Sequence, residues 1–214
     1  MKIRAIIFDM DGVISDTQTL AANVESKILK RYGIDMSPGY LTATYAGTKH
    51  KYMYEKEFSS RKMNIDVDTV VDETWNEILS SENLITPIDG IYELITMLKK
   101  QDYKLAVASG SRKEFIKIVL KKLELTDTFN ITASSDEVAN GKPSPDLFLM
   151  VAKKLHVKPE ECIVIEDGTN GMIAAKSAGM KCIGLVSDAG KYPADITVKS
   201  LKDIDISLLH RLEN

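Results

Sequence analysis

Short apolar runs alternate with amphipathic segments along most of the chain. The runs are too short for helices and end next to Gly, Ser, Asn or Asp, so each predicts a buried strand. The segments between them repeat apolar residues at helical spacing, and in the last of them Ser144 suits the N-cap and Pro145 the first helical position. The alternation predicts an α/β fold with a mainly parallel sheet and helices on both faces. The predicted strands are 5–8, 104–109, 130–134, 162–167 and 181–186, and the predicted helices are 90–101, 112–125 and 144–155.

Residues 17–83 break this pattern. They contain no convincing strand and predict several helices, one of them ending near Gly47. Because this stretch is long for a connection between two strands, we expect it to be an inserted all-helical cap domain. The chain would return to the core near Pro87 through paired connecting segments that act as a hinge. Residues 1–16 and 84–214 would then form the α/β core domain.

The charge balance argues against a nucleic-acid partner. The 214 residues include 28 Lys and Arg against 31 Asp and Glu, a formal net charge of −3, whereas nucleic-acid binding calls for a clustered basic excess. No apolar run approaches the roughly 18 residues of a membrane helix, and the N-terminus lacks the apolar stretch of a secretory leader. Cys162 and Cys182 suit buried free thiols in a reducing compartment. We therefore expect a cytoplasmic protein, most simply a monomer, with neither a nucleic-acid nor a membrane partner.

Polar residues gather just past the ends of the predicted strands. The carboxyl ends of parallel strands share one edge of a sheet, and open sheets bind their ligands at that edge. The polar groups are Asp9-Met10-Asp11-Gly12, Ser109-Gly110-Ser111, Lys142-Pro143 and Glu166-Asp167-Gly168.

Four of these side chains are carboxylates, those of Asp9, Asp11, Glu166 and Asp167. Like charges about 4 Å apart repel by about 4 kcal/mol at an effective dielectric constant of 20, so the cluster calls for a cation. Carboxylates that leave room for water and a phosphate oxygen suit Mg²⁺. Lys142 adds a fixed positive charge, and the neighbouring serines offer hydroxyl groups, so the pattern indicates a metal and a phosphate.

At this point the chain resembles the haloacid dehalogenase superfamily, in its phosphatase and β-phosphoglucomutase-like branch. The resemblance rests on FDMDGVISDT, VASGS, GKPSPDLF and IEDGTNG, which occur in the family's order, and it covers essentially the whole chain. It implies a Rossmann-like open parallel sheet with an inserted helical cap. It further implies a Mg²⁺-dependent phosphatase of the phosphoric monoester hydrolase type, acting on small phosphorylated sugars or polyols.

The resemblance also implies a role for each matching residue. Asp9 would attack phosphorus and become an aspartyl-phosphate, and Asp11 would protonate the leaving oxygen and later activate water. Ser109, Gly110, Ser111 and Lys142 would hold the transferring phosphoryl group. Mg²⁺ would be bound by Asp9, Asp167 and the backbone carbonyl of Asp11. Glu166 would either bind the ion as well or orient the groups that do. Asp16, which follows the first motif, could cap the first helix of the insert or hold a water near the metal, and we favour a structural role at the hinge.

The cap would close over this site and add substrate contacts from a loop in its middle. Thr48, Lys49 and His50 are the candidates for these contacts, and an ordinary solvated helix start is the equally weighted alternative. A glycine-rich dinucleotide site is excluded because Gly168-x-x-Gly171 does not fit G-x-G-x-x-G.

Two further activities compete with the phosphatase. The first is a β-phosphoglucomutase-type mutase. Those enzymes carry a histidine five residues after the aspartate that matches Asp16, where this chain has Ala21, a residue that cannot donate a hydrogen bond. The second is a non-catalytic signalling domain that accepts a phosphoryl group on aspartate. Such domains are shorter and lack a large helical insert, and Asp11 would promote the hydrolysis that a signalling phosphate must avoid.

Overall fold

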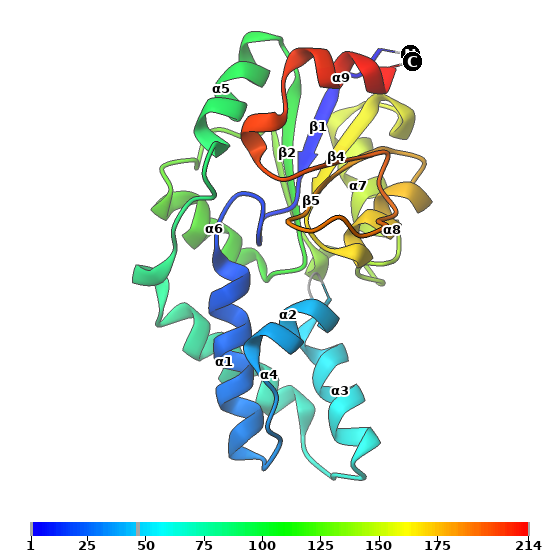
Figure 1. Cartoon of the computed structure of the whole chain (residues 1–214). Coiled ribbons are helices and arrows are strands. Elements are labelled where there is room, and N and C mark those ends of the chain that lie inside the picture. Colours follow the sequence, from blue (N-terminus) through cyan, green and yellow to red (C-terminus); the bar gives the residue numbers. More distant parts are fainter. Residues whose placement is uncertain (1, 46–47, 214) are drawn as a thin grey trace.

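The computed structural model describes residues 2–45 and 48–213, and its centre is a six-stranded parallel sheet (Figure 1). The strand order is β3-β2-β1-β4-β5-β6, so the chain moves outward from β1 in one direction and then returns to add strands on the other side. The point of reversal lies between β1 and β4, which is where open α/β sheets form their ligand crevice. The strands are β1 Ala5–Phe8, β2 Lys104–Ser109, β3 Ile131–Ser134, β4 Cys162–Glu166, β5 Lys181–Leu185 and β6 Ile196–Val198.

Helices cover both faces of the sheet because successive side chains of each strand point to opposite sides. Ile6 and Phe8 of β1 join the apolar core under α5, α6 and α9, whereas Ala5 and Ile7 join a second core under α7 and α8. The strands are therefore apolar on both faces, as in other fully covered parallel sheets. These helices are α5 Ile91–Lys100, α6 Lys113–Lys122, α7 Asp146–Leu155, α8 Thr169–Ser177 and α9 Ile206–Glu213, with short 3₁₀ turns at Glu82–Leu84, Ser135–Glu137, Pro159–Glu161 and Leu201–Asp203.

The segment inserted after β1 forms an all-helical cap below the carboxyl edge of the sheet (Figure 1). Its two connections run side by side: Asp16 N donates to Thr86 O at 2.9 Å, and Ile88 N donates to Ile14 O at 3.0 Å. The predicted fold class, an open parallel sheet with a helical cap, is thus confirmed. Division of the chain into domains at 16/17 and 83/84 stays a prediction, and Gly47 lies outside the described residues. The cap helices are α1 Thr17–Arg31, α2 Pro38–Tyr45, α3 His50–Ser60 and α4 Val67–Leu79.

The five predicted strands all form, with ends that differ by at most one residue, and three details differ from expectation. The helix expected from Ser144 begins at Asp146, with Pro145 at the N-cap, although the Ser144 hydroxyl both donates to the Asp146 carboxylate at 2.8 Å and accepts from Asp146 N at 3.5 Å. The Asp16 carboxylate accepts from the Thr19 hydroxyl rather than from a backbone N–H. The edge strand β6 was not predicted, since three residues carry too little periodicity.

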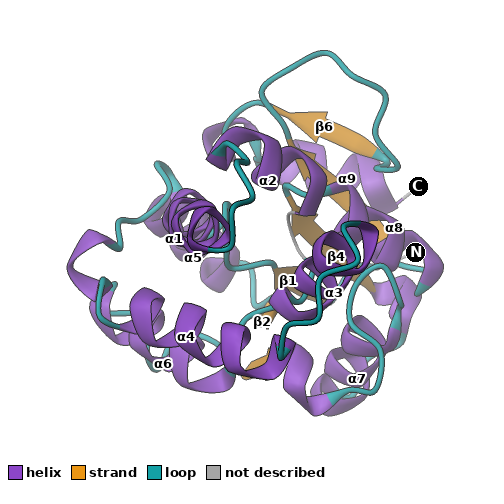
Figure 2. Cartoon of the chain, turned by 90° about the horizontal axis from the view of Figure 1, so that it is seen from below, coloured by secondary structure: helices purple, strands orange, loops and turns teal. Residues whose placement is uncertain are grey.

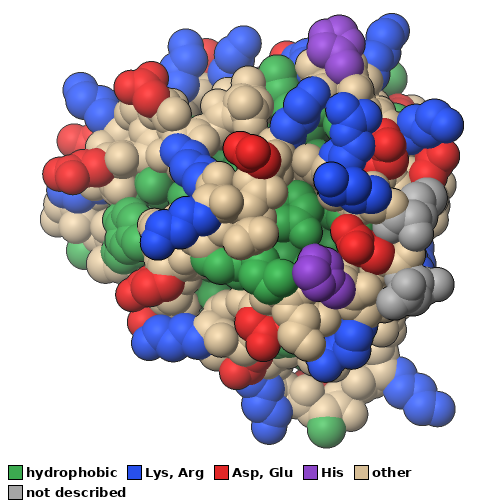
Figure 3. Space-filling model, turned by 90° about the horizontal axis from the view of Figure 1, so that it is seen from above, with side chains coloured by type: hydrophobic (Ala, Val, Ile, Leu, Met, Phe, Trp, Pro, Cys, Tyr) green, Lys and Arg blue, Asp and Glu red, His purple; other side chains and the backbone are tan. Residues whose placement is uncertain are grey.

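The two ends of the molecule differ in what they expose. Seen from the cap side, α1 points toward the viewer and the other cap helices spread in front of the sheet (Figure 2). On the opposite side, Lys and Arg side chains are interspersed with Asp and Glu (Figure 3).

Within the described residues, none of the helices combines the length and apolar character that a bilayer span requires. Cys162 and Cys182 are free and buried, as predicted.

Candidate active site

Parallel pairing between β1 and β4 brings the first two carboxylates of the site together. Phe8 lies beside Ile165, and Asp9 N donates to Ile165 O at 3.0 Å, so the two chains leave the sheet in register. Asp9 and Glu166 therefore sit next to each other, and both are almost fully buried. Two carboxylates in this position need a positive charge close by.

Lys142 supplies a positive charge from the loop before α7. Its Nζ lies 2.5 Å from Asp9 Oδ1 and 2.7 Å from Glu166 Oε1, and it donates to Ala108 O at 3.1 Å. The Lys142 side chain is 0% exposed, so all of its charge is directed at these partners. Burial opposes the charged form, but the carboxylates of Asp9 and Glu166 outweigh it and raise the pKa of Lys142. The fixed positive charge expected from Lys142 thus lies beside Asp9 and Glu166.

Asp9, Glu166 and Asp167 together form a donor set that fits a hard divalent cation. One carboxylate oxygen from each lies within 4.8 Å of the others. Burial raises the pKa of Asp9 to about 8, with Lys142 opposing and the neighbouring carboxylates adding to the rise. Burial and the same carboxylates also raise the pKa of Asp167. The single positive charge of Lys142 therefore does not neutralise the carboxylates of the cluster. A donor set made only of oxygen atoms suits Mg²⁺.

Two glycines make room for these carboxylates. Gly12 has a φ of +89°, and a Cβ there would overlap the Asp167 carboxylate. A Cβ on Gly171, in the first turn of α8, would overlap the Glu166 carboxylate. Both oxygens of Glu166 already have donors, Lys142 Nζ and the Gly168 N–H at 2.7 Å. This arrangement fits Glu166 as the orienting member and Asp167 as the more available ligand.

The Asp11 carboxylate has hydrogen-bond partners that differ from those of Asp9. Its Oδ2 accepts from the Ser109 and Ser111 hydroxyls, each at 3.0 Å, and its Oδ1 accepts from the Thr17 hydroxyl. Three hydroxyl donors thus fix this carboxylate beside the cavity. The predicted metal contact of Asp11 through its backbone carbonyl stays a prediction.

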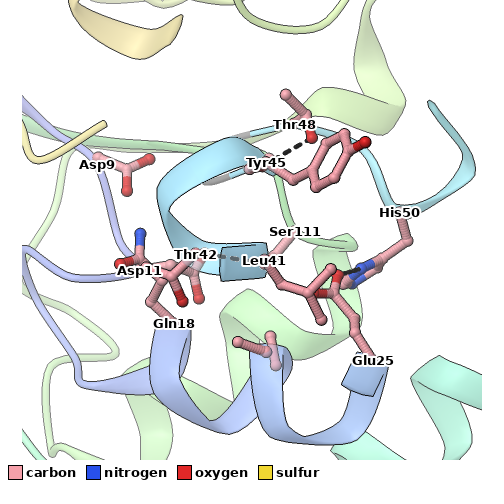
Figure 4. Close-up of a pocket in the computed structure, with 13 residues that line it drawn as sticks. Asp9, Asp11, Gln18, Glu25, Leu41, Thr42, Tyr45, Thr48, His50 and Ser111 are labelled. Atoms are coloured by element: carbon pink, nitrogen blue, oxygen red, sulfur yellow. Dashed lines mark hydrogen bonds and ion pairs between the residues drawn. The ribbon is translucent and has the colours of Figure 1, made fainter. Parts of the chain in front are cut away.

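A small cavity of about 70 Å³ lies between the core motifs and the cap (Figure 4). Asp9, Asp11, Gly110 and Ser111 line it from the core. Of the predicted cap contacts, Thr48 and His50 also line it. Lys49 instead lines a neighbouring cavity and lies against the 139–143 loop, since a Cβ on Gly141 would be 3.2 Å from Lys49 Cε. Thr48 and His50 thus line the same cavity as Asp9 and Asp11, whereas Lys49 lines the adjoining cavity together with Lys142.

Of one face of the first cap helix, sequence reasoning named only Ala21 and missed its neighbours. Gln18, Ala21, Ala22 and Glu25 of α1 line the cavity, and Gln18 Nε2 donates to Asp167 Oδ2 at 3.0 Å. The spacing of 18, 21 or 22, and 25 is that of one helix face, which was the signal available in the sequence. Thr17, the partner of Asp11, directly precedes this face.

Comparison with known proteins decides the family. The model of haloacid dehalogenase-like hydrolases matches residues 6–185. The chain belongs to this family. It is 29% identical over 210 residues to hexitol phosphatase B of Escherichia coli (strain K12), covering 95% of each protein. It is 31% identical over 223 residues to the β-phosphoglucomutase of Bacillus subtilis (strain 168), covering 97% of this chain and 94% of the relative.

A solved structure gives the same picture. The crystal structure of β-phosphoglucomutase from Clostridium difficile superposes with a TM-score of 0.88 at 29% identity, covering 99% of this chain and 97% of the other. Family membership identifies this protein as an enzyme of the haloacid dehalogenase-like hydrolase type, and its relatives include phosphatases. Phosphatase and mutase relatives are similar to it to almost the same degree, so the local site must discriminate between them.

Proposed function

We propose that the protein is a Mg²⁺-dependent phosphatase that hydrolyses small phosphorylated sugars or polyols through an aspartyl-phosphate on Asp9. The observation that carries the proposal is the different surroundings of two carboxylates only two residues apart. Asp9 faces a buried ammonium group and the acidic cluster, whereas three hydroxyl groups hold Asp11 at the cavity. Different environments of this kind are how one site separates a nucleophile from an acid–base group.

In the first half of the proposed reaction, an oxygen of Asp9 attacks phosphorus and the bond to the ester oxygen breaks. Lys142, whose ammonium lies 2.5 Å from Asp9, orients the carboxylate and offsets the charge of the phosphoryl group. Mg²⁺, bound by Asp9 and Asp167 with Glu166 orienting, would polarise the phosphoryl oxygens as a Lewis acid. The Ser109 and Ser111 hydroxyls, which otherwise donate to Asp11, would turn toward the same oxygens, and the backbone around Gly110 would donate beside them.

Asp11 would transfer the protons in both halves. In the first half, protonated Asp11 gives its proton to the leaving alcohol oxygen, so that a neutral alcohol departs. In the second half, the Asp11 carboxylate takes a proton from water as the water oxygen attacks phosphorus and releases phosphate from Asp9. The hydrogen bond from the Thr17 hydroxyl holds the carboxylate in one orientation for both steps.

One feature of the cap side supports hydrolysis over mutase chemistry. Ala21 lines the cavity, and its methyl group offers no hydrogen bond that could delay engagement of Asp11. Water therefore meets no gating side chain at this position.

The cavity of about 70 Å³ is far smaller than the about 300–1,000 Å³ of typical ligand sites, so we expect the cap to move away when substrate enters.

The test is to incubate the purified protein and Mg²⁺ with β-glucose 1-phosphate and a trace of the 1,6-bisphosphate, following both inorganic phosphate and glucose 6-phosphate. A panel of sugar and polyol phosphates and p-nitrophenyl phosphate is assayed in parallel for repeated turnover. Release of phosphate without net isomerisation supports the proposal. Glucose 6-phosphate that forms much faster than phosphate would overturn it in favour of a mutase, and a single turnover at most would favour a phospho-accepting signalling domain.

We further propose that the enzyme works in the cytoplasm as a monomer. The two buried free thiols fit a reducing compartment, and burial raises the pKa of both, which keeps them unreactive. Light scattering coupled to gel filtration at assay concentration tests the oligomeric state, and a mass twice that of the chain would contradict it.

A further inference from the structure

We infer that Glu25 and His50 form a recognition pair at the cap end of the cavity, which selects monophosphate esters whose leaving group carries neutral hydroxyls and rejects substrates with a second anionic group. This inference rests on the proposed phosphatase function and names the substrate class of the same site. Under this inference, α1 and α3 of the cap determine substrate specificity, which the core motifs do not.

The pair is built into the cap. Glu25 Oε1 lies 2.6 Å from His50 Nδ1, and Figure 4 shows the two side chains meeting beside Leu41 at the wall of the cavity. The Glu25 and His50 side chains are only 11% and 13% exposed. The His50 ring also packs edge-on against Trp75, with centroids 4.7 Å apart. Contacts on both sides thus hold the imidazole, and through it the carboxylate, in place.

The other cap residues that line this cavity carry no charge. Away from the core motifs, the described residues that line the cavity offer hydroxyl, amide or apolar groups, and none of them is Lys or Arg. The cationic cap residues Lys49, Lys51 and Lys56 line the neighbouring cavity, which adjoins this one at Tyr45 and Thr48 and which neither Glu25 nor His50 lines. Apart from Glu25 and His50, the lining residues outside the core motifs are Gln18, Ala21, Ala22, Leu41, Thr42, Tyr45 and Thr48.

The charge of the pair decides which groups it accepts. A protonated imidazole would cancel the Glu25 carboxylate, and a neutral imidazole would leave a net negative charge, so the pair never carries a net positive charge. A second phosphate or a carboxylate at this end would face Glu25 without a compensating cation, at a partly buried position where screening by salt is weak. Sugar or polyol hydroxyls, in contrast, donate hydrogen bonds to a carboxylate oxygen.

The test measures binding separately from turnover. In the Asp9→Asn background, which we expect to bind without reacting, isothermal titration calorimetry in Mg²⁺ compares glucitol 6-phosphate with glucitol 1,6-bisphosphate. We expect the monophosphate to bind at least about tenfold more tightly than the bisphosphate. Adding Glu25→Gln should reduce this preference by about tenfold, chiefly through tighter binding of the bisphosphate, because it removes the charge and keeps the shape.

Glu73→Gln is the matched control, since Glu73 is an exposed cap carboxylate paired with Arg31 rather than with a cavity residue. It should leave the preference within twofold of its starting value. Equal affinities for the two ligands before Glu25 is changed would overturn the inference, and so would a preference that Glu25→Gln leaves intact. Failure of the unmutated protein to hydrolyse any phosphate ester would overturn the proposed function, while these affinities would still report on Glu25 and His50.

Discussion

The core and the cap both bury charged side chains, but they position them in different ways. In the core, Lys142 meets Asp9 and Glu166, which are 133 and 24 residues away in sequence, and strand ends bring them together. In the cap, Glu25 meets His50 across two helices, and Glu57 accepts from the Tyr45 hydroxyl on a neighbouring helix. Backbone ladders fix the first set of contacts, whereas side-chain packing between helices fixes the second.

This difference suggests a division of labour. Parallel pairing is set by backbone hydrogen bonds and by alternation of apolar residues, so the core site keeps its geometry whatever alcohol the phosphate carries. Helix packing tolerates changes of side chain more readily, so the cap can vary its contacts while the chemistry stays the same. Changes in the core should therefore lower activity toward every substrate, whereas changes in the cap should alter the ranking of substrates.

The largest effect is expected from Asp9→Asn. An amide is a poor nucleophile, so turnover of all substrates should fall by about 10⁵-fold. Phosphate release from a sugar phosphate and from p-nitrophenyl phosphate measures the loss, and Asp16→Asn, the same change at an exposed carboxylate bonded only to Thr19, serves as control. If Asp9→Asn kept more than a few per cent of the activity, the covalent mechanism would be wrong.

Removal of divalent cations should be the next largest effect. Without Mg²⁺, Asp9, Glu166 and Asp167 would repel the phosphate dianion, with only Lys142 to offset them, so turnover should fall by about 10³-fold in a chelator. Activity is measured before chelation, after it, and after Mg²⁺ is added back, which should restore the original rate. Full activity in excess chelator would contradict the assignment of the acidic cluster to a metal.

Asp11→Asn should have a smaller effect that depends on the leaving group. Loss of the acid–base group should slow hydrolysis of alkyl phosphates by about 10²–10³-fold. The first step with p-nitrophenyl phosphate should be affected much less, because nitrophenolate leaves without a proton. Rapid quench of the nitrophenolate burst separates the two steps, and circular dichroism checks the fold. An equal loss in the first step for both kinds of ester would argue against Asp11 as the proton donor.

The same division explains how much the sequence predicted. The strands from residue 5 to residue 185 and the polar motifs after them were predictable. Short apolar runs, and the carboxylates that follow some of them directly, are visible in the local sequence. Their meeting at one edge followed from the general geometry of parallel sheets. The Glu25–His50 contact did not follow, because it depends on how α1 and α3 pack, and a helix face alone does not name its partner. Lys49 extends toward Gly141 and lines a cavity that Lys142 also lines, so its contact with substrate stays a prediction.

Trp75 offers a test of the cap that keeps the core intact. It is 5% exposed, supports the His50 ring, and packs against Phe115 of the core helix α6 with centroids 5.6 Å apart. Trp75→Phe should lower the free energy of unfolding by about 1–2 kcal/mol and change the ratio of kcat/KM between hexitol phosphates and p-nitrophenyl phosphate. Phe58→Leu, which perturbs a buried cap aromatic packed on Tyr54, should destabilise similarly without changing that ratio. Equal effects on the ratio would show that general loosening of the cap, rather than support of His50, sets specificity.

The smallest effect is expected at the seam between the two regions. Arg112, at the start of α6, donates to Asp72 Oδ1 of the cap at 2.7 Å, and its guanidinium lies 5.6 Å from the centroid of the Trp75 ring. Both members of the ion pair are more than a third exposed, so Arg112→Gln should lower the free energy of unfolding by less than about 1 kcal/mol. The contact does, however, hold the cap against the core, so its loss should shift the cap toward open arrangements.

A contribution of this size changes the ratio of closed to open molecules by no more than about fivefold. We therefore expect Arg112→Gln to raise KM by about two- to fivefold. This difference in KM should shrink at high salt, because salt screens the ion pair of the unmutated protein. Arg31→Gln is the matched control, because Arg31 pairs with Glu73 and Glu77 inside the cap and does not cross the seam. It should lower the unfolding temperature by a similar amount and leave KM unchanged. A rise in KM for both variants would mean that cap stability, and not the contact across the seam, controls access to the site.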